Sequence, residues 1–293
     1  MKASSYLYFN TLTTVEYAIM TGMLQKLREK YRYSTILLRE LVKTDFKLRY
    51  EGSALGIVWS VLRPLMLFGV MYVVFVHFLK FGAGVPFFAV SLLLAIVLWS
   101  FFQETTSQGM RIIVDRGNIL RKVNIPKYVL VVSASMSALI NLGINLVVVS
   151  VFALLSGVEF TPAAFLIIPI IIELYIFALA VAMALSALYV KFRDIGHIWD
   201  VVMQAGYFAT PIIYPLSMII AMSPMAAKVI LMSPMAQMIQ DARSVLVYNQ
   251  TETVWNTFTF VPYMFIPIAI VVIITIIAVI YFRRASKYFT ELV

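Results

Sequence analysis

The stretch Ala187–Pro215, which reads ALYVKFRDIGHIWDVVMQAGYFATPIIYP, places a charged break between two long apolar runs. The break is the four-residue segment KFRD at 191–194. The second run carries a line of aromatic residues and two prolines, Pro211 and Pro215. A soluble domain has little use for a charged break between two segments of membrane-spanning length. In a membrane protein, the same pattern predicts a short cytosolic turn between two spans.

The composition supports this interpretation. Hydrophobic residues make up 62% of the chain and charged residues 13%, and the charges are clustered so that several long runs contain few or none. Lipid offers no hydrogen-bond partner to backbone N–H and C=O groups, so each span must be helical. The sequence therefore predicts an all-α polytopic membrane protein.

Six transmembrane helices are predicted, and the distribution of Lys and Arg orients them. The first fifty residues lack the compact apolar segment of a signal peptide, which favours a cytosolic N-terminus. With that choice, nineteen Lys and Arg residues fall in inner segments and three in outer loops, so both termini are expected in the cytosol. This bias and anionic lipid explain the net charge of +9 more simply than nucleic acid does. The predicted spans are Leu55–Leu79, Phe87–Gly109, Tyr128–Leu155, Ala163–Val190, Ile198–Ile220 and Tyr263–Phe282.

The region before the first span is predicted to hold a cytosolic extension, residues 1–33, followed by a helix at the membrane surface. The transmembrane domain is taken as 34–293. Over Ser34–Tyr50, cations at Arg39, Lys43 and Lys47 line one face of the expected helix, and leucine and valine side chains line the other. This pattern predicts an amphipathic interface helix. A solvated charged helix is the alternative.

The outer segment Met222–Pro262 is too long and too apolar for a plain loop. It contains the local repeat SPM at 223–225 and 233–235. Serine at the N-cap followed by proline at the first helical position starts a helix, so two short helices are predicted before the last span. Neither is long enough to cross the membrane, and we expect both to be re-entrant.

The motifs of catalysis and metal binding are missing from the sequence. It has no phosphate loop, no His-Glu-x-x-His motif and no Gly-x-Ser-x-Gly motif, and its only histidines, His77 and His197, are far apart. We therefore predict no catalytic residue, no metal site and no cofactor on this chain.

Ionisable residues inside the predicted membrane region are costly and mark functional candidates. Arg63 is expected to reach the inner surface or to form a salt bridge with Glu104. Glu173 could relay protons, although a secondary transporter normally shows several such groups. Asp241 and Arg243 are expected to pair with each other or to face the pore mouth.

Aromatic residues follow two predicted spans. Sugar rings stack on aromatic planes, so two aromatic stripes along one pathway would suit an oligosaccharide. Core packing or contact with lipid is the alternative for both stripes. The first stripe is Phe68, Tyr72 and Phe75, and the second is Trp199, Tyr207, Phe208 and Tyr214.

Several stretches together resemble the permease subunit of bacterial type-2 ABC exporters that carry lipid-linked polysaccharides such as O-antigen or teichoic acid. They are ILLRELVKTDFKLRY at 36–50, GSALGIVWSVLRPL at 52–65, GNILRKVNIP at 117–126, FRD at 192–194 and PIIYP at 211–215. The resemblance extends from about residue 34 to the end of the chain.

The resemblance implies a homodimer in the bacterial cytoplasmic membrane, with two copies of a separate ATPase subunit that bind ATP and magnesium. It implies that Arg39, Lys43, Arg116, Gly117, Asn118, Arg193 and Asp194 belong to segments that couple to the ATPase. The charges of Arg193 and Asp194 are expected to fix their turn by an ion pair or a helix cap. The first and fifth spans would line the pore, with the aromatic stripes facing the glycan. Pro224, Pro234, Asp241 and Arg243 would lie in its outer gate.

Two other functions stay open at this point. One is a type-2 ABC permease for drugs or small lipids, and the other is a proton-coupled secondary transporter.

Overall fold

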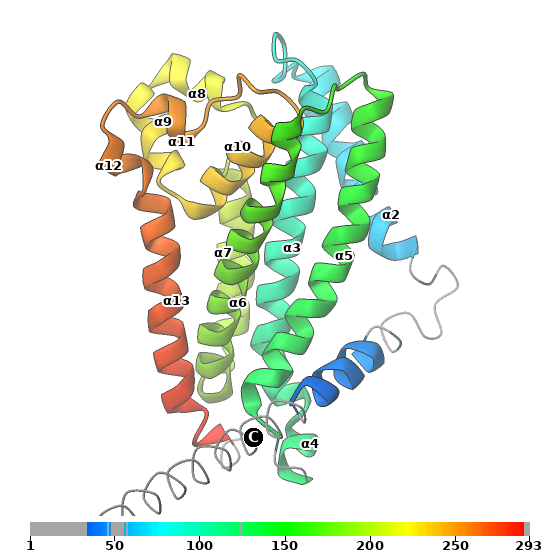
Figure 1. The fold of residues 1–293 in the computed structure, drawn as a ribbon, viewed down its shortest axis with the longest axis vertical. Coiled ribbons are helices and arrows are strands. Elements are labelled where there is room, and N and C mark those ends of the chain that lie inside the picture. Colours follow the sequence, from blue (N-terminus) through cyan, green and yellow to red (C-terminus); the bar gives the residue numbers. More distant parts are fainter. Residues whose placement is uncertain (1–33, 46, 48–55, 57, 123–124, 290–293) are drawn as a thin grey trace, which may run out of the picture.

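The computed structural model describes residues 34–45, 47, 56, 58–122 and 125–289, and every regular element in these residues is a helix (Figure 1). A helix over 34–45 comes first. The elements that follow are α2 (Val58–Met71), η1 (Tyr72–Phe78), α3 (Phe88–Asp115), α4 (Gly117–Lys122), α5 (Lys127–Leu155), η2 (Pro162–Leu166), α6 (Ile167–Lys191), α7 (Ile195–Ala209), α8 (Leu216–Met222), α9 (Pro224–Leu231), α10 (Pro234–Leu246), α11 (Val254–Thr257), α12 (Val261–Met264) and α13 (Ile266–Ala285).

Five helical segments within the described residues are long and apolar enough to cross a membrane. They correspond to five of the six predicted spans. The remaining one, predicted over Ile198–Ile220, is not a single helix, because residues 210–215 separate α7 from α8. Pro211 and Pro215 explain the interruption, since proline has no backbone N–H to continue a helix. The five segments are Val58–Phe78, Phe88–Asp115, Lys127–Leu155, Pro162–Lys191 and Ile266–Ala285.

Helix α3 forms the centre of the bundle, with α5 and α6 packed against it (Figure 1). Of its most apolar 18-residue window, 78% is buried, against none of the corresponding window in α2 and η1. A glycine brings α3 and α6 close together: a Cβ atom added at Gly109 would lie 2.7 Å from the Cβ of Ala182 in α6. The low burial of α2 and η1 shows that they lie at the edge of the bundle with an open face.

The two ends of the bundle differ in charge. The helix over 34–45, α4, the α6–α7 turn and the C-terminal end of α13 lie at one end, and α8 to α12 lie at the other (Figure 1). Among the described residues, Lys80 and Lys228 are the cations toward the second end, apart from the buried Arg243. The first end carries Arg39, Lys43, Lys47, Arg111, Arg116, Lys191, Arg193, Arg283, Arg284 and Lys287. The arrangement follows the positive-inside bias, and the first end is called the inner end below.

The helix over 34–45 confirms the predicted two-sided pattern where the structure describes it. Leu41 is buried against Ile113 and Leu120, whereas Arg39 and Lys43 are exposed. The predicted extension 1–33 and most of the predicted continuation to Tyr50 lie outside the described residues.

The two short helices predicted from the Ser-Pro repeat are present as α9 and α10. Each begins with its proline, Pro224 or Pro234, and the hydroxyl of Ser223 accepts a hydrogen bond from the backbone N–H of Ala226 at 3.3 Å. Helix α10 is buried over Pro234–Arg243 against α3, α6 and α13. The repeat therefore gives two helices with different environments, because α9 stays at the surface.

Candidate functional site

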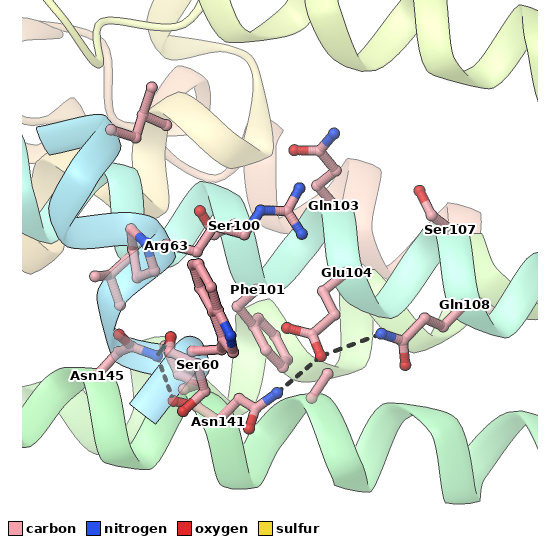
Figure 2. Close-up of a pocket in the computed structure, with 16 residues that line it drawn as sticks. Ser60, Arg63, Ser100, Phe101, Gln103, Glu104, Ser107, Gln108, Asn141 and Asn145 are labelled. Atoms are coloured by element: carbon pink, nitrogen blue, oxygen red, sulfur yellow. Dashed lines mark hydrogen bonds between the residues drawn. The ribbon is translucent and has the colours of Figure 1, made fainter. Parts of the chain in front are cut away.

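A cavity of about 600 Å³ opens between α2, α3 and α5 (Figure 2). We call it the polar cavity, because most of its labelled lining residues carry polar or charged side chains. These are Ser60 and Arg63 of α2, Ser100, Gln103, Glu104, Ser107 and Gln108 of α3, and Asn141 and Asn145 of α5.

The polar lining of α3 follows the helical repeat. Its residues recur at positions 100, 103, 104, 107 and 108, which fall on one face of a helix. This spacing is visible in the sequence, and our sequence analysis noted only Glu104 among these residues. The pattern marks the face of α3 that lines a polar space inside an otherwise apolar bundle.

One wall of the polar cavity is fixed by hydrogen bonds. Glu104 Oε1 accepts hydrogen bonds from Gln108 Nε2 at 3.2 Å and from Asn141 Nδ2 at 2.9 Å. Asn145 Nδ2 donates to the carbonyl oxygens of Ser60 at 3.1 Å and Asn141 at 2.8 Å. These bonds tie α5 to α3 and α2, so the amide side of the cavity is held in place.

Arg63 lies on the other side of the polar cavity. Its side chain extends from α2 toward Ser100 and Gln103, away from the bonds of Asn141 (Figure 2). The predicted salt bridge with Glu104 is absent, and in the part of the chain that the structure describes Arg63 forms no hydrogen bond or ion pair. The guanidinium group is therefore available inside the cavity.

A second cavity of about 440 Å³ lies between α2, α3 and α7, and we call it the aromatic cavity. Leu67, Ser100 and Gln103 line both cavities, so the two adjoin along α3. Trp99, Tyr207 and Phe208 contribute the aromatic part of its lining, and Gln204 and Asp200 contribute polar groups.

The first aromatic stripe does not keep a single face. Phe68 packs edge-on against Phe152 of α5, with 5.5 Å between ring centroids, and Phe75 packs against Phe81 at 5.4 Å. Tyr72 contacts Phe68, with 5.7 Å between ring centroids, but it is 41% exposed. The switch to a π-helix over Tyr72–Phe78 changes the residue spacing per turn, so the stripe expected for an α-helix is divided.

The second aromatic stripe is divided as well. Trp199 donates from Nε1 to Thr106 Oγ1 of α3 at 3.1 Å, and Tyr214 donates its hydroxyl to the carbonyls of Phe208 and Ala209, each at 3.2 Å. Phe208 is 52% exposed. The structure thus brings Tyr207 and Phe208 to the aromatic cavity, whereas Trp199 joins α7 to α3 and Tyr214 bonds back to the end of α7.

The predicted ATPase-coupling residues in and beside the helix over 34–45 include buried and exposed side chains. Arg116, at the end of α3, forms a largely buried ion pair with Asp45 of the helix over 34–45. Burial lowers the pKa of the Arg116 guanidinium, which makes the nearby carboxylate an important partner. Lys43 pairs with Glu40 at the surface. Gly117 is buried at the start of α4 and Asn118 is exposed.

The α6–α7 turn is not held as the sequence predicted. The guanidinium of Arg193 lies over the ring of Tyr189, 5.4 Å from its centroid, and not against Asp194. Asp194 occupies the N-cap position of α7 without accepting a side-chain capping bond. A stacking contact therefore takes the place of the expected ion pair or cap. Arg111 and Asp200, 3.5 Å apart, connect α3 with α7 nearby.

Arg243 and Asp241 do not pair with each other, and Arg243 is only 3% exposed. The Arg243 guanidinium donates to the carbonyl oxygens of Ser91 (3.2 Å), Pro211 (2.6 Å) and Ile212 (2.8 Å) and to the side chain of Gln240 (2.8 Å). It thereby joins α10 to α3 and to the interruption between α7 and α8.

Asp241 has its own partners. Its Oδ2 accepts hydrogen bonds from Gln237 Nε2 at 2.7 Å and from Trp255 Nε1 at 3.2 Å. Gln237 Nε2 also lies 3.5 Å from Glu173 Oε2 of α6. Of the other outer-gate candidates, Pro234 is buried and Pro224 is exposed.

Long apolar helices, cations concentrated at one end and cavities between the spans define a multi-pass membrane protein. Comparison with known proteins makes this more specific. Residues 36–247 match the ABC-2 type transporter family, and the chain belongs to that family.

Two named proteins are similar to this chain. The O-antigen export system permease protein RfbA of Myxococcus xanthus is 31% identical over 198 residues, covering 67% of this chain and 75% of that protein. A protein of the same name from Klebsiella pneumoniae is 28% identical over 197 residues, covering 66% of this chain and 74% of that protein.

Proposed function

We propose that this chain is the membrane-spanning permease subunit of an ATP-driven exporter, and that it moves a lipid-linked polysaccharide of the O-antigen or teichoic-acid type out of the cytosol. Membership of the ABC-2 type transporter family carries the proposal, and the O-antigen export relatives give the substrate class. The polar and aromatic cavities support it, since a glycan needs both hydroxyl partners and stacking surfaces.

The working assembly in this proposal is a homodimer. Helix α7 buries only Gly196 and Met203, α2 buries only Pro64, and η1 buries no residue within the single chain. Ile198, Val201 and Phe208 of α7 are all more than half exposed. Two open faces beside the two cavities fit a pathway that a second copy completes.

Energy comes from a separate ATPase subunit, two copies of which bind ATP and magnesium at the inner end. The segments that would receive its motion are the helix over 34–45, α4 and the α6–α7 turn, which gather at that end (Figure 1). Arg39, Lys43, Asn118, Arg193 and Asp194 are exposed there and suit a protein contact. Arg116 and Gly117, which are less exposed, would hold that surface in position through their contacts inside the chain.

Helices α8 to α12, at the end opposite the inner end, form what we call the outer layer, and this layer closes the pathway in the proposal. Helix α7, the interruption at 210–215 and α8 together form the sixth crossing, and α9 and α10 are the re-entrant pair. The chain lies in the bacterial cytoplasmic membrane with both termini in the cytosol, as the cation distribution favours. Membrane lipid surrounds it.

The glycan-facing surface is narrower than the two aromatic stripes suggested. Tyr72, Tyr207 and Phe208 are the aromatic candidates that the contacts leave at a cavity or an open face. Phe68, Phe75, Trp199 and Tyr214 would support the pathway through packing.

Deleting the gene in the organism that encodes it tests the function. We expect loss of the surface glycan and accumulation of lipid-linked glycan in the cytosol, both reversed by the wild-type chain. A chain carrying Tyr72→Ala and Phe208→Ala should restore export only in part. Full surface glycan after deletion would overturn the proposal and favour a permease for drugs or small lipids, whereas full glycan export by the double variant would show that Tyr72 and Phe208 do not contact the glycan.

A further inference from the structure

We propose that the polar cavity binds the phosphate-bearing head group of a lipid-linked substrate, with Arg63 contacting the phosphate and Gln103 contacting the adjoining sugar. The inference rests on the proposed function and assigns a site within it. It adds a polar subsite to a pathway so far defined by aromatic residues.

Arg63 is the first observation. Placing a guanidinium group within a spanning helix is costly unless it has a partner. Arg243, in the same bundle, has four acceptors, whereas Arg63 has none in the part of the chain that the structure describes. Glu104 does not fill the role, because it accepts hydrogen bonds from Gln108 and Asn141 on the opposite wall. An anion from outside the chain would complete the site.

The height of Arg63 points to a lipid head group as the source of that anion. Arg63 lines the cavity together with Ser100 of α3, and Asn145 of α5 bonds to Ser60, one turn before Arg63. Ser100 lies near the middle of α3 (Phe88–Asp115), so Arg63 lies about halfway through the bundle. A lipid-linked head group that crosses the membrane has to pass this depth, whereas the phosphates of the surrounding lipids stay at the two membrane surfaces. A planar guanidinium group can bind phosphate through two parallel hydrogen bonds.

The rest of the lining suits a sugar next to the phosphate. Ser100, Gln103 and Ser107 offer hydroxyl and amide groups that both donate and accept hydrogen bonds, as sugar hydroxyls require. Asn141 and Asn145 are held by their own bonds and give the cavity a fixed wall. The volume of about 600 Å³ falls in the range of small-molecule sites, so it suits a head group and not a long chain.

The polar cavity adjoins the aromatic cavity, and this arrangement orders the parts of a bound substrate. Gln103 and Ser100 also line the aromatic cavity, where Tyr207 and Phe208 present their rings. A head group held at Arg63 would therefore place the following sugars beside these aromatic side chains. The two cavities would then bind successive parts of one molecule.

A binding experiment tests the assignment with the full-length chain in phosphatidylcholine nanodiscs. The probes are a polyprenyl diphosphate carrying one sugar, the same polyprenyl diphosphate without sugar, and phosphatidylglycerol. We expect the sugar-bearing probe to bind at least about tenfold more tightly than phosphatidylglycerol, a factor that corresponds to one strong charged contact. Arg63→Gln should weaken both diphosphates about tenfold or more, and Arg63→Lys should weaken them less.

Two further variants separate the contacts. Gln103→Leu should weaken only the sugar-bearing probe. Arg284→Gln, which removes an exposed cation at the inner end, should leave all affinities unchanged. Thermal unfolding midpoints equal to that of the wild-type chain would show that the Arg63 variants fold.

Two outcomes would overturn the site. One is wild-type affinity of Arg63→Gln for both diphosphates. The other is equally tight, Arg63-dependent binding of phosphatidylglycerol, which would make the cavity a general phospholipid site. Either outcome leaves polysaccharide export standing if gene deletion abolishes the surface glycan. Retention of that glycan after deletion would instead remove the proposed function.

Discussion

Two arginines within the same bundle have opposite environments. Arg243 of α10 is buried and bonded to three backbone carbonyls and a glutamine, whereas Arg63 of α2 extends into a cavity without a partner in the described chain. The first joins α10, α3 and the α7–α8 interruption. The second stands on a helix that buries only Pro64. The contrast separates a fixed outer layer from the open face of α2, and it assigns a structural role to the first and ligand contact to the second.

The largest expected effect breaks the fixed layer. Arg243→Met would leave the carbonyls of Ser91, Pro211 and Ile212 buried without donors, at a cost of about 3 kcal/mol or more. Arg63→Met should change stability by only about 0.5 kcal/mol or less. Thermal unfolding in detergent, followed by tryptophan fluorescence, compares the two. Equal losses would show that the two arginines do not differ as the contacts indicate.

A second prediction concerns the inner end, where buried and exposed charges lie on one short helix. Asp45→Asn would leave the largely buried guanidinium of Arg116 without its counter-charge, and should cost about 2 kcal/mol and reduce export. Lys43→Gln removes one member of an exposed pair and should be nearly neutral for stability. Unfolding midpoints and export per unit of protein measure both. The double variant Asp45→Arg with Arg116→Asp should recover part of the loss, and no recovery would argue against the pair.

Much of this contrast between the outer layer and the face of α2 that carries Arg63 could not be predicted from the sequence. Hydropathy predicted five of the spans, and Ser-Pro repeats predicted α9 and α10, because those signals are local. The bonds of Arg243 join residues 31 to 152 positions apart, and no local pattern specifies them. The face of α3 at 100, 103, 104, 107 and 108 was detectable, but Asn141 and Asn145, which complete the wall, come from another span. The π-helix at Tyr72–Phe78 divided a stripe that α-helical spacing had made continuous.

A third prediction compares packed and open faces through two helical glycines. A Cβ at Gly109 would meet the Cβ of Ala182 at 2.7 Å, so Gly109→Ala should destabilise the chain by about 1–3 kcal/mol. Gly143 of α5 has nothing within 4 Å of the same position. Gly143→Ala should be neutral or stabilising by up to about 1 kcal/mol, because alanine favours helix. Unfolding midpoints of the two variants, measured side by side, decide whether α3 and α6 are as close as the structure shows.

The smallest expected effect separates ATP-driven export from proton coupling. Glu173 of α6 faces Gln237 of the outer layer and is not among the lining residues of either cavity. A carboxylate that carried coupling protons would have to reach the transport pathway. Glu173→Gln keeps the size of the side chain and its hydrogen-bonding capacity, so export should stay at the wild-type level. Inactivation of the partner ATPase should abolish export in the same cells. Transport that survived ATPase inactivation and collapsed with Glu173→Gln would assign the driving force to protons, and the open face of α2 would then belong to a secondary transporter.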